Sequence, residues 1–232
     1  MAKETNLDQV KSVALNFLYL KIEPTSLAPM VVSHPFTNSA FVYMDGEIKD
    51  IYNNIDNQEA WRKWVKRLIA ESDDLFKIIL MINKPYILTF LKHIQEYISP
   101  FDMGRVLSYG WTTTEFVSDN PNVTKTQLVK MFKISDRKSL MNDEEQEVLA
   151  SLPDNVIIYR GVNCEAKKYI RQLSWTLDID KAKWFSNRLR KPDNKPAVYT
   201  AEIEKIDILA YFKTEQEVVV DTRKLESINR IY

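Results

Sequence analysis

Cysteine, histidine and glycine are scarce in this chain, and each shortage excludes a class of site. The 232 residues include one cysteine, Cys164, and two histidines, His34 and His93. A single thiol cannot form a disulfide within the chain, and one cysteine excludes cysteine-rich zinc sites. With only two histidines, catalysis by a serine–histidine or cysteine–histidine pair is also poorly supported. None of the four glycines is spaced as in the GxGxxG or P-loop motifs, which excludes Rossmann and P-loop folds. We therefore expect no metal ion, and a structural role for Cys164.

Net charge and long apolar runs are also lacking. The 32 basic residues balance the 32 acidic ones, so no overall field attracts the chain to nucleic acid or anionic lipid. The N-terminal residues lack the basic segment and apolar run of a signal peptide. The densest apolar stretch, residues 75–98, contains Lys77, Pro85 and Lys92 and falls short of the about 18–20 apolar residues that cross a bilayer. We expect a cytoplasmic protein without a membrane partner.

The first 150 residues are predicted to be mainly helical, because apolar residues recur there at helical spacing. One exception is a hairpin near residues 39–52, where Asp45-Gly46 forms a two-residue connection of the kind favoured in tight hairpins. Three prolines predict a loop over residues 23–38. The expected helices cover residues 6–20, 58–70 with Asn57 as cap, 73–98 with an interruption near Pro85, 124–132 and 143–152, while residues 111–122 are expected to be irregular.

Two tryptophans stand out in the helix expected at residues 58–70. Trp61 and Trp64 are three residues apart and could form a surface on which a ligand stacks. Tryptophan at this spacing more often faces the interior of a protein. We therefore expect both side chains to pack in the core.

The pattern changes after Pro153, where short β-rich segments replace the helical periodicity. Many short strands with few helices indicate an α+β fold. We expect a domain boundary near residue 150, with the helical region 1–150 packed on a core formed by residues 151–232. The expected strands cover residues 156–159, 173–177, 197–203, 208–212, 217–221 and 228–232, with a helix over 178–190.

Two polar segments of this core suggest ligand binding. Arg160-Gly161 follows an apolar strand, and an arginine at a strand end can hold an anion with its planar fork or form an ion pair with a carboxylate. Ser174 and Thr176 lie two residues apart in the next strand, so both hydroxyls point to one side. Two such hydroxyls can bind a ribose or orient a carboxylate, although they are also ordinary strand residues.

A third segment places two carboxylates ahead of an apolar strand. Glu215 and Glu217 flank a glutamine, and they share one side if the strand begins there. Carboxylates that lie close together tend to separate in pKa, which allows them different chemical roles. The alternative is a solvated strand end.

The order of these segments resembles the R-S-E class of mono-ADP-ribosyltransferases, which includes bacterial toxins, phage-encoded enzymes and vertebrate ectoenzymes. The resemblance extends over residues 155–221 and depends on Arg160-Gly161, on Ser174 with the downstream Ala-x-x-Phe helix, and on Glu215-Gln216-Glu217. It implies a core of two small packed β-sheets, NAD as co-substrate, and transfer of ADP-ribose with release of nicotinamide. It also suggests a prophage or toxin-like enzyme that acts inside a bacterial cell.

The resemblance implies a role for each matching residue. Arg160 would hold the phosphate and ribose region of NAD, beside Gly161. Ser174 would orient the catalytic glutamate and contact the nicotinamide ribose. Glu217 would bind that ribose, and Glu215 corresponds to the first acid of a Glu-x-Glu form associated with guanidinium acceptors. The chain departs from the family's Ser-Thr-Ser pattern at two positions, Trp175 and Thr176.

The acceptor and several alternatives stay open. Glu-x-Glu favours arginine on a protein, whereas a cluster of basic residues beside the expected site can grip phosphates of a nucleic acid or form a solvated helix face. Arg188, within this cluster, is a further candidate for NAD binding. An NAD glycohydrolase, an inactive NAD or ADP-ribose binding module, and an interaction protein are the competing functions, and the oligomeric state is undetermined. The cluster consists of Lys181, Lys183, Arg188, Arg190, Lys191 and Lys195.

Overall fold

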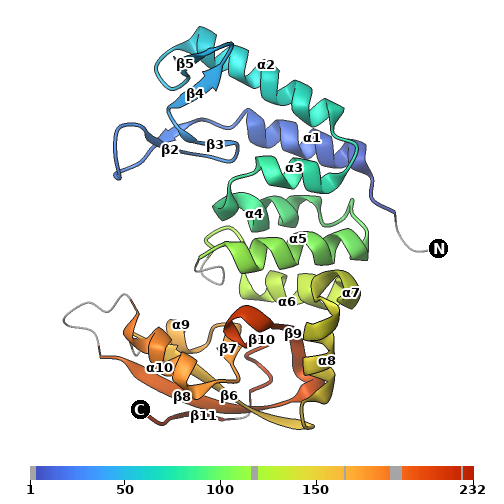
Figure 1. Ribbon diagram of the computed structural model, residues 1–232, viewed down its shortest axis with the longest axis vertical. Helices are drawn as coiled ribbons and strands as arrows, with labels where there is room; N and C mark the ends of the chain where they lie inside the picture. Colours follow the sequence, from blue (N-terminus) through green and yellow to red (C-terminus); the bar gives the residue numbers. More distant parts are fainter. Residues whose placement is uncertain (1–3, 116–119, 165, 189–194, 226) are drawn as a thin grey trace. The chain divides into compact units, whose positions relative to one another are not determined.

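The computed structural model describes residues 4–115, 120–164, 166–188, 195–225 and 227–232 (Figure 1). The chain divides into two compact units, residues 1–115 and 116–232. This division differs from the boundary expected near residue 150, because helices expected in the N-terminal region group with the C-terminal sheet. Both units contain helices and small sheets, as expected for an α+β protein. No helix among the described residues is both long and apolar enough to cross a membrane.

Within residues 4–115, five helices surround a core of apolar side chains. Helices α1 and α4 contact each other, and each contacts a further helix, α2 and α5 respectively. Val10, Ile87 and Phe90 are among the side chains fully buried in this core. The helices are α1 (Leu7–Leu18), α2 (Ile55–Glu71), α3 (Leu75–Met81), α4 (Lys84–Ile94) and α5 (Pro100–Thr113).

Strands also form in the first unit, partly where a loop was expected. Strands β1 (Glu23–Pro24), β2 (Val31–His34) and β3 (Thr37–Ser39) make a three-stranded antiparallel sheet, so the loop prediction for residues 23–38 was wrong. Pro24 lies in an edge strand, where a missing amide hydrogen is tolerated. The expected hairpin is confirmed as β4 (Phe41–Met44) and β5 (Glu47–Asp50). Its connection has positive φ at both central residues.

Three helix boundaries in the first unit differ from the sequence prediction. Helix α2 begins three residues earlier, because the side chain of Asn54, rather than that of Asn57, accepts the capping hydrogen bond. The expected interruption near Pro85 is confirmed, since α3 ends at Met81 and Pro85 is the second residue of α4, but α4 ends at Ile94 and not at residue 98. The C-terminal part of α5 occupies a segment expected to be irregular, and Ser99 caps its start.

The two tryptophans of α2 have different environments. Trp61 is 2% exposed and packs edge-on against His34, as expected. Trp64 is 42% exposed. The prediction that both pack in the core was therefore wrong for Trp64, because the buried stripe of α2 passes through Trp61, Val65 and Ile69.

The second unit is built on one six-stranded antiparallel sheet with the order β11-β8-β6-β7-β10-β9. We expected two small packed sheets, but the strands form one sheet. Among the described residues, its two halves are joined by a single residue pair, Tyr159 of β6 and Thr176 of β7. Helices α6 and α8 contact the edge strand β9, all of whose residues are buried. The strands are β6 (Asn155–Val162), β7 (Ser174–Thr176), β8 (Ala197–Glu204), β9 (Ile208–Phe212), β10 (Glu217–Val220) and β11 (Ile228–Arg230). The helices are α6 (Lys125–Ile134), α7 (Arg137–Leu140), α8 (Asp143–Ser151), α9 (Lys167–Ile170) and α10 (Ile179–Asn187), with 3-10 turns η2 (Lys205–Asp207) and η3 (Lys213–Glu215).

Candidate functional site

The short strand β7 brings the three predicted anchor segments onto neighbouring strands. Thr176 of β7 pairs with Tyr159 of β6 on one side and with Glu217 of β10 on the other. Residues that pair directly across an antiparallel sheet point to the same face. Glu217 and Thr176 therefore share a face, although they are far apart in the sequence.

Ser174 occupies the same face, two residues before Thr176. It pairs with Val219 and is therefore the diagonal neighbour of Glu217, at a separation of about 7–8 Å between Cα atoms. Ser174 and Glu217 are both partly buried. No hydrogen bond of the Ser174 hydroxyl occurs among the described residues, so this hydroxyl can bind a ligand.

Arg160 lies at the junction between β6 and β7, and strand alternation turns its side chain to the face opposite that of Tyr159. If the antiparallel register continued beyond Tyr159, Gly161 would stand opposite Ser174, but the pairing stops at Tyr159. The guanidinium of Arg160 instead donates hydrogen bonds to the carbonyl oxygens of Ser174 and of Tyr169, the latter at 2.7 Å. Arg160 thus fixes the main chain at the start of β7.

The Thr176 hydroxyl has a positioning role. It donates to the carbonyl oxygens of Glu215 at 3.1 Å and Gln216 at 3.2 Å, and it accepts from the amide of Asp178 at 3.2 Å. Thr176 is only 4% exposed. The Thr176 hydroxyl, one of the two that the sequence offered for binding a ribose of NAD, is therefore engaged with the turn that precedes Glu217.

Glu215 and Glu217 do not lie on one strand. Strand β10 begins at Glu217, whereas Glu215 ends the 3-10 turn η3 and is exposed. The intervening Gln216 has a left-handed conformation, with φ of 46°. Strand alternation, the reason for expecting the two carboxylates on one side, does not apply because the left-handed residue reverses the direction of the chain between them. A non-glycine residue in this conformation is strained by about 1–3 kcal/mol, and such strain is frequent at functional sites.

Gly161 is required by the packing of a helix. A Cβ atom at this position would lie 1.7 Å from the carbonyl oxygen of Ala182 and 2.7 Å from the amide of Ser186, both in α10. The absence of a side chain therefore allows α10 to lie directly on β6. Gly161 therefore has a packing role, in addition to the contact with NAD that the sequence predicts.

Helix α10 also carries two residues of the basic cluster, Lys181 and Lys183, and Arg188 follows its end. The Lys181 ammonium donates to the carbonyl of Thr214 at 3.1 Å and so ties α10 to the turn before Glu217, a contact that the sequence did not reveal. The guanidinium of Arg188 lies over the ring of Trp184, which is 58% exposed, at 5.4 Å. Lys183 pairs with Asp180, Lys195 is exposed, and Arg190 and Lys191 lie outside the described residues.

An ion pair secures the far end of β10. Both carboxylate oxygens of Asp221 accept hydrogen bonds from the Arg223 guanidinium, at 2.7 and 2.8 Å. These bonds hold the pKa of the Asp221 carboxyl below its usual value, although burial opposes the shift. Beside the pair, the amide of Val220 donates to the carbonyl of Leu173 at 2.8 Å. The strand that carries Glu217 is thus held at both ends.

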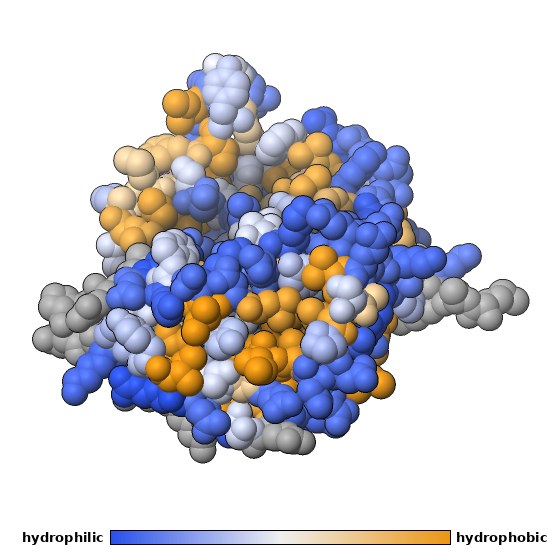
Figure 2. Space-filling view, turned by 60° about the horizontal axis from the view of Figure 1, so that its bottom comes forward, coloured by the Kyte–Doolittle hydropathy of each residue, from blue (hydrophilic) through white to orange (hydrophobic). Residues whose placement is uncertain are grey.

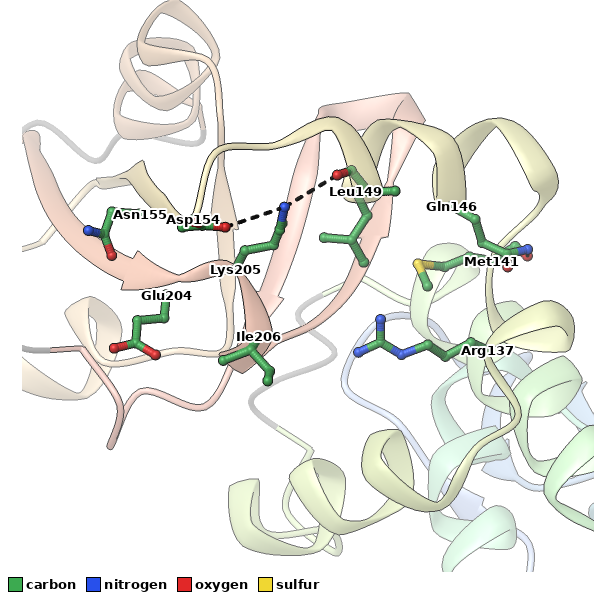
Figure 3. A pocket seen from close by; sticks show the side chains of 10 residues that line it. Arg137, Met141, Gln146, Leu149, Asp154, Asn155, Glu204, Lys205 and Ile206 are labelled. Atoms are coloured by element: carbon green, nitrogen blue, oxygen red, sulfur yellow. Dashed lines mark hydrogen bonds and ion pairs between the residues drawn. The ribbon is translucent and has the colours of Figure 1, made fainter.

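A pocket of about 760 Å³ lies elsewhere in the second unit (Figure 3). It is lined by residues of α7, α8 and the ends of β6 and β8, including Arg137, Leu149, Asn155 and Lys205. Asn155 is five residues from Arg160 along β6, which corresponds to roughly 17 Å. None of the predicted site residues lines this pocket. The candidate site is therefore defined by the strand register and the hydrogen bonds around β7, and not by this cavity.

The arrangement around β7 combines the carboxylate of Glu217 with the hydroxyl of Ser174, and the Arg160 guanidinium binds the main chain of β7. Such a set can bind the hydroxyl groups of a sugar and stabilise a positive centre that develops on it. Among the described residues, no group of three or more His, Cys, Asp or Glu side chains is placed to hold a metal ion. Comparisons with protein-family models, with curated proteins and with solved structures found no match.

Proposed function

We propose that this protein is an NAD-dependent mono-ADP-ribosyltransferase that transfers ADP-ribose to arginine side chains of a protein acceptor and releases nicotinamide. The observation that supports the proposal most directly is the meeting of three distant segments at β7. Glu217 and Ser174 are diagonal neighbours on one face, and Arg160 binds the carbonyl of Ser174. Their order in the chain is also the one that resembles the R-S-E class.

The chemistry needs few catalytic groups. When the bond between nicotinamide and ribose breaks, the bonding electrons leave with neutral nicotinamide, and an oxocarbenium-like centre develops at the ribose, as in glycoside cleavage. A fixed carboxylate nearby stabilises that positive centre. The departing base is neutral, so a strong general acid such as a histidine is not required.

Each residue has a role in this scheme. Glu217 stabilises the cationic ribose and accepts a hydrogen bond from one of its hydroxyls, and Ser174, its diagonal neighbour, contacts the same ribose. Arg160 maintains β7 and, with Arg188, provides positive charge for the diphosphate of NAD. Glu215 receives the proton that the incoming guanidinium nitrogen loses when it bonds to the ribose.

The decisive experiment is the substitution Glu217→Gln. It keeps the shape of the side chain and removes its charge, so we expect nicotinamide release from NAD to fall by at least about 10²–10³-fold, as is typical when one stabilising electrostatic group is lost. Glu202→Gln, at an exposed position of β8, serves as the matched control and should retain full activity. Near-native turnover in a folded Glu217→Gln protein would overturn the proposal.

Glu215→Gln separates transfer from hydrolysis. We expect it to slow transfer to a small guanidinium compound such as agmatine more than it slows NAD hydrolysis, because water needs less orientation than a guanidinium. Equal losses in both reactions would contradict the role of Glu215. If wild-type protein hydrolyses NAD and transfers nothing, water is the acceptor and the protein is an NAD glycohydrolase.

The acceptor class can be determined with labelled NAD and a bacterial lysate. After incubation with the purified protein, the label should become soluble on protease treatment and resist nuclease. Label that is released only by nuclease would replace protein arginine with a nucleic-acid acceptor. In that case the basic side chains of α10, such as Lys181, are the first candidates for contact with phosphates.

A further inference from the structure

The β4–β5 hairpin of the first unit presents a hydrophobic face to solvent. The register pairs Tyr43 with Ile48 and Phe41 with Asp50, so Phe41, Tyr43 and Ile48 lie on one side of the ribbon. Their side chains are 44%, 71% and 74% exposed. On the opposite side, Val42 is partly buried and Met44 is buried. We call Phe41, Tyr43 and Ile48 the hairpin face.

The hairpin face extends towards a neighbouring loop. The amide of Ala40, just before Phe41, donates to the carbonyl of Met30 at 2.8 Å, and Met30 is itself 59% exposed. Large apolar side chains that reach the surface in groups characterise interaction surfaces more than isolated ones do. Figure 2 colours apolar residues orange on another face of the molecule, where they also reach the surface in places. The hairpin face is therefore a candidate interaction surface.

The rim of the hairpin face is acidic. Asp50 lies on the hairpin face and Asp45 in the connection, while Glu47 and Lys49 lie on the opposite side of the ribbon. Together these four rim residues have a formal charge of −2 (three negative charges and one positive). Lys49 already pairs with Asp45 at 3.0 Å and with Glu47 at 3.5 Å. Nucleic acids and anionic lipids are repelled by such a rim, so the partner is a protein surface that is apolar and basic.

Helix α2 of the same unit offers a surface with this chemistry. Lys63, Trp64, Lys66 and Arg67 are all exposed, and their spacings of three and four residues make them neighbours on the helix. Lys63 and Lys66 form no ion pair within the described part of the chain, and Arg67 has only a distant one with Glu71, at 3.9 Å. We call these four residues the α2 basic face.

We propose that the hairpin face of one copy of this chain docks on the α2 basic face of a second copy. Two such contacts, one in each direction, close a symmetric dimer in which every pairing occurs twice. Tyrosine and tryptophan, present at Tyr43 and Trp64, are typical of the centres of protein interfaces. The complementary rims orient the two copies and exclude a like-charged partner.

A charge-exchange experiment tests this dimer. The hairpin variant Asp45→Asn with Glu47→Lys changes the rim charge from −2 to +1, because two lysines then face the single carboxylate of Asp50. Asparagine suits the left-handed backbone at position 45, where φ is 54°. The helix variant Lys63→Glu with Lys66→Glu makes the α2 basic face acidic. Sedimentation velocity and light scattering measure the mass of each protein at micromolar concentration.

The expected pattern is specific to reciprocal docking. Wild type should be a dimer, and each variant alone should dimerise at least about tenfold more weakly, since like charges then face each other. An equimolar mixture of the two variants should restore the dimer, because one of its two contacts then joins the basic hairpin to the acidic helix and the other joins the unaltered hairpin to the unaltered helix. Tyr43→Ser with Ile48→Ser should also abolish the dimer, whereas Ile206→Ser, at an 81% exposed position of the second unit, should preserve it.

Three results would each overturn the inference. They are a monomeric wild type, charge variants that dimerise as wild type does, and a mixture that stays monomeric. Circular dichroism melts of every variant establish that it is folded. Because the second unit is unaltered in the hairpin and helix variants, their NAD cleavage measures the proposed function separately from the oligomeric state.

Discussion

At the scale of single residues, the hydroxyl of Thr176 stabilises the turn that directly precedes Glu217, the first residue of β10. Thr176 bonds to the carbonyls of Glu215 and Gln216 and receives the amide of Asp178, while Gln216 occupies a left-handed conformation that most side chains avoid. A strained backbone persists only when its surroundings determine it. The position of the candidate catalytic carboxylate therefore depends on a residue that does not itself need to contact substrate.

Substitution of Thr176 tests this dependence. Thr176→Val retains the shape of the side chain and removes all three hydrogen bonds, so we expect kcat for nicotinamide release to fall by about tenfold or more while KM for NAD changes little. Thr176→Ser keeps the hydroxyl and should restore most of the activity. A Thr176→Ser protein as impaired as Thr176→Val would show that the methyl group, and not the hydroxyl, is what matters.

His34 confers a pH dependence on the stability of the first unit. Its ring is 1% exposed, and burial lowers its pKa from 6.5 to about 4. Between these pH values the His34 side chain is protonated in the unfolded chain but stays neutral in the folded chain. The free energy of unfolding should therefore decrease as pH falls from 6.5 to about 4. We expect a loss on the order of 2 kcal/mol across this range.

Denaturant titrations over this pH range measure the effect. Carboxylates also titrate at its acidic end, so the His34→Gln protein provides the reference, and its stability should vary less with pH than that of wild type. His93→Gln is the control and should behave as wild type. Parallel pH curves for wild type and His34→Gln would refute the contribution of His34.

At the scale of elements, the contact of α10 with β6 depends on Gly161. Gly161→Ala places a Cβ 1.7 Å from the carbonyl oxygen of Ala182, which belongs to the main chain and cannot rotate away. We expect the second unit to lose about 3 kcal/mol or more of stability, at the upper end for overpacking, and activity to fall with the displacement of α10. Denaturant unfolding and nicotinamide release measure the two effects.

Gly46→Ala is the matched control for this substitution. A Cβ at Gly46 meets nothing within 4 Å, but φ is 84°, so only backbone strain of about 1 kcal/mol is expected there. The loss should be confined to the first unit and leave activity unchanged. A Gly161→Ala protein as stable as Gly46→Ala would contradict the close packing of α10.

Element boundaries were predictable where the local signal was unambiguous. The strand β9 begins and ends where the sequence predicts, because five consecutive apolar residues are bounded by polar ones. The start of α2 was not predictable, since Asn54 and Asn57 are both good caps and the choice depends on the preceding hairpin. The sheet over residues 23–38 was missed because its strands are very short and are stabilised by pairing, not by their own propensity.

At the scale of the whole molecule, the two compact units should respond differently to NAD. If residues 116–232 carry the proposed site, NAD at about a hundredfold excess over Kd stabilises that unit by about 2.7 kcal/mol. Hydrogen exchange should then slow in segments of this unit, above all in β7 and β10, and stay unchanged in residues 4–115. Protection confined to the first unit would locate NAD binding outside the proposed site.

The sequence by itself determined the mixed α+β composition, most helices and strands, and the order of the segments that contain Arg160, Ser174 and Glu217. These follow from local periodicity, capping and turn chemistry, which act over a few residues. Tertiary structure alone decided that β7 lies between β6 and β10, that the Thr176 hydroxyl serves a turn instead of facing a ligand, and that Glu215 leaves the strand. It also decided that Trp64 stays exposed. Each of these depends on strand pairing or packing between residues distant in the chain, and no local pattern encodes which distant partner a residue will meet.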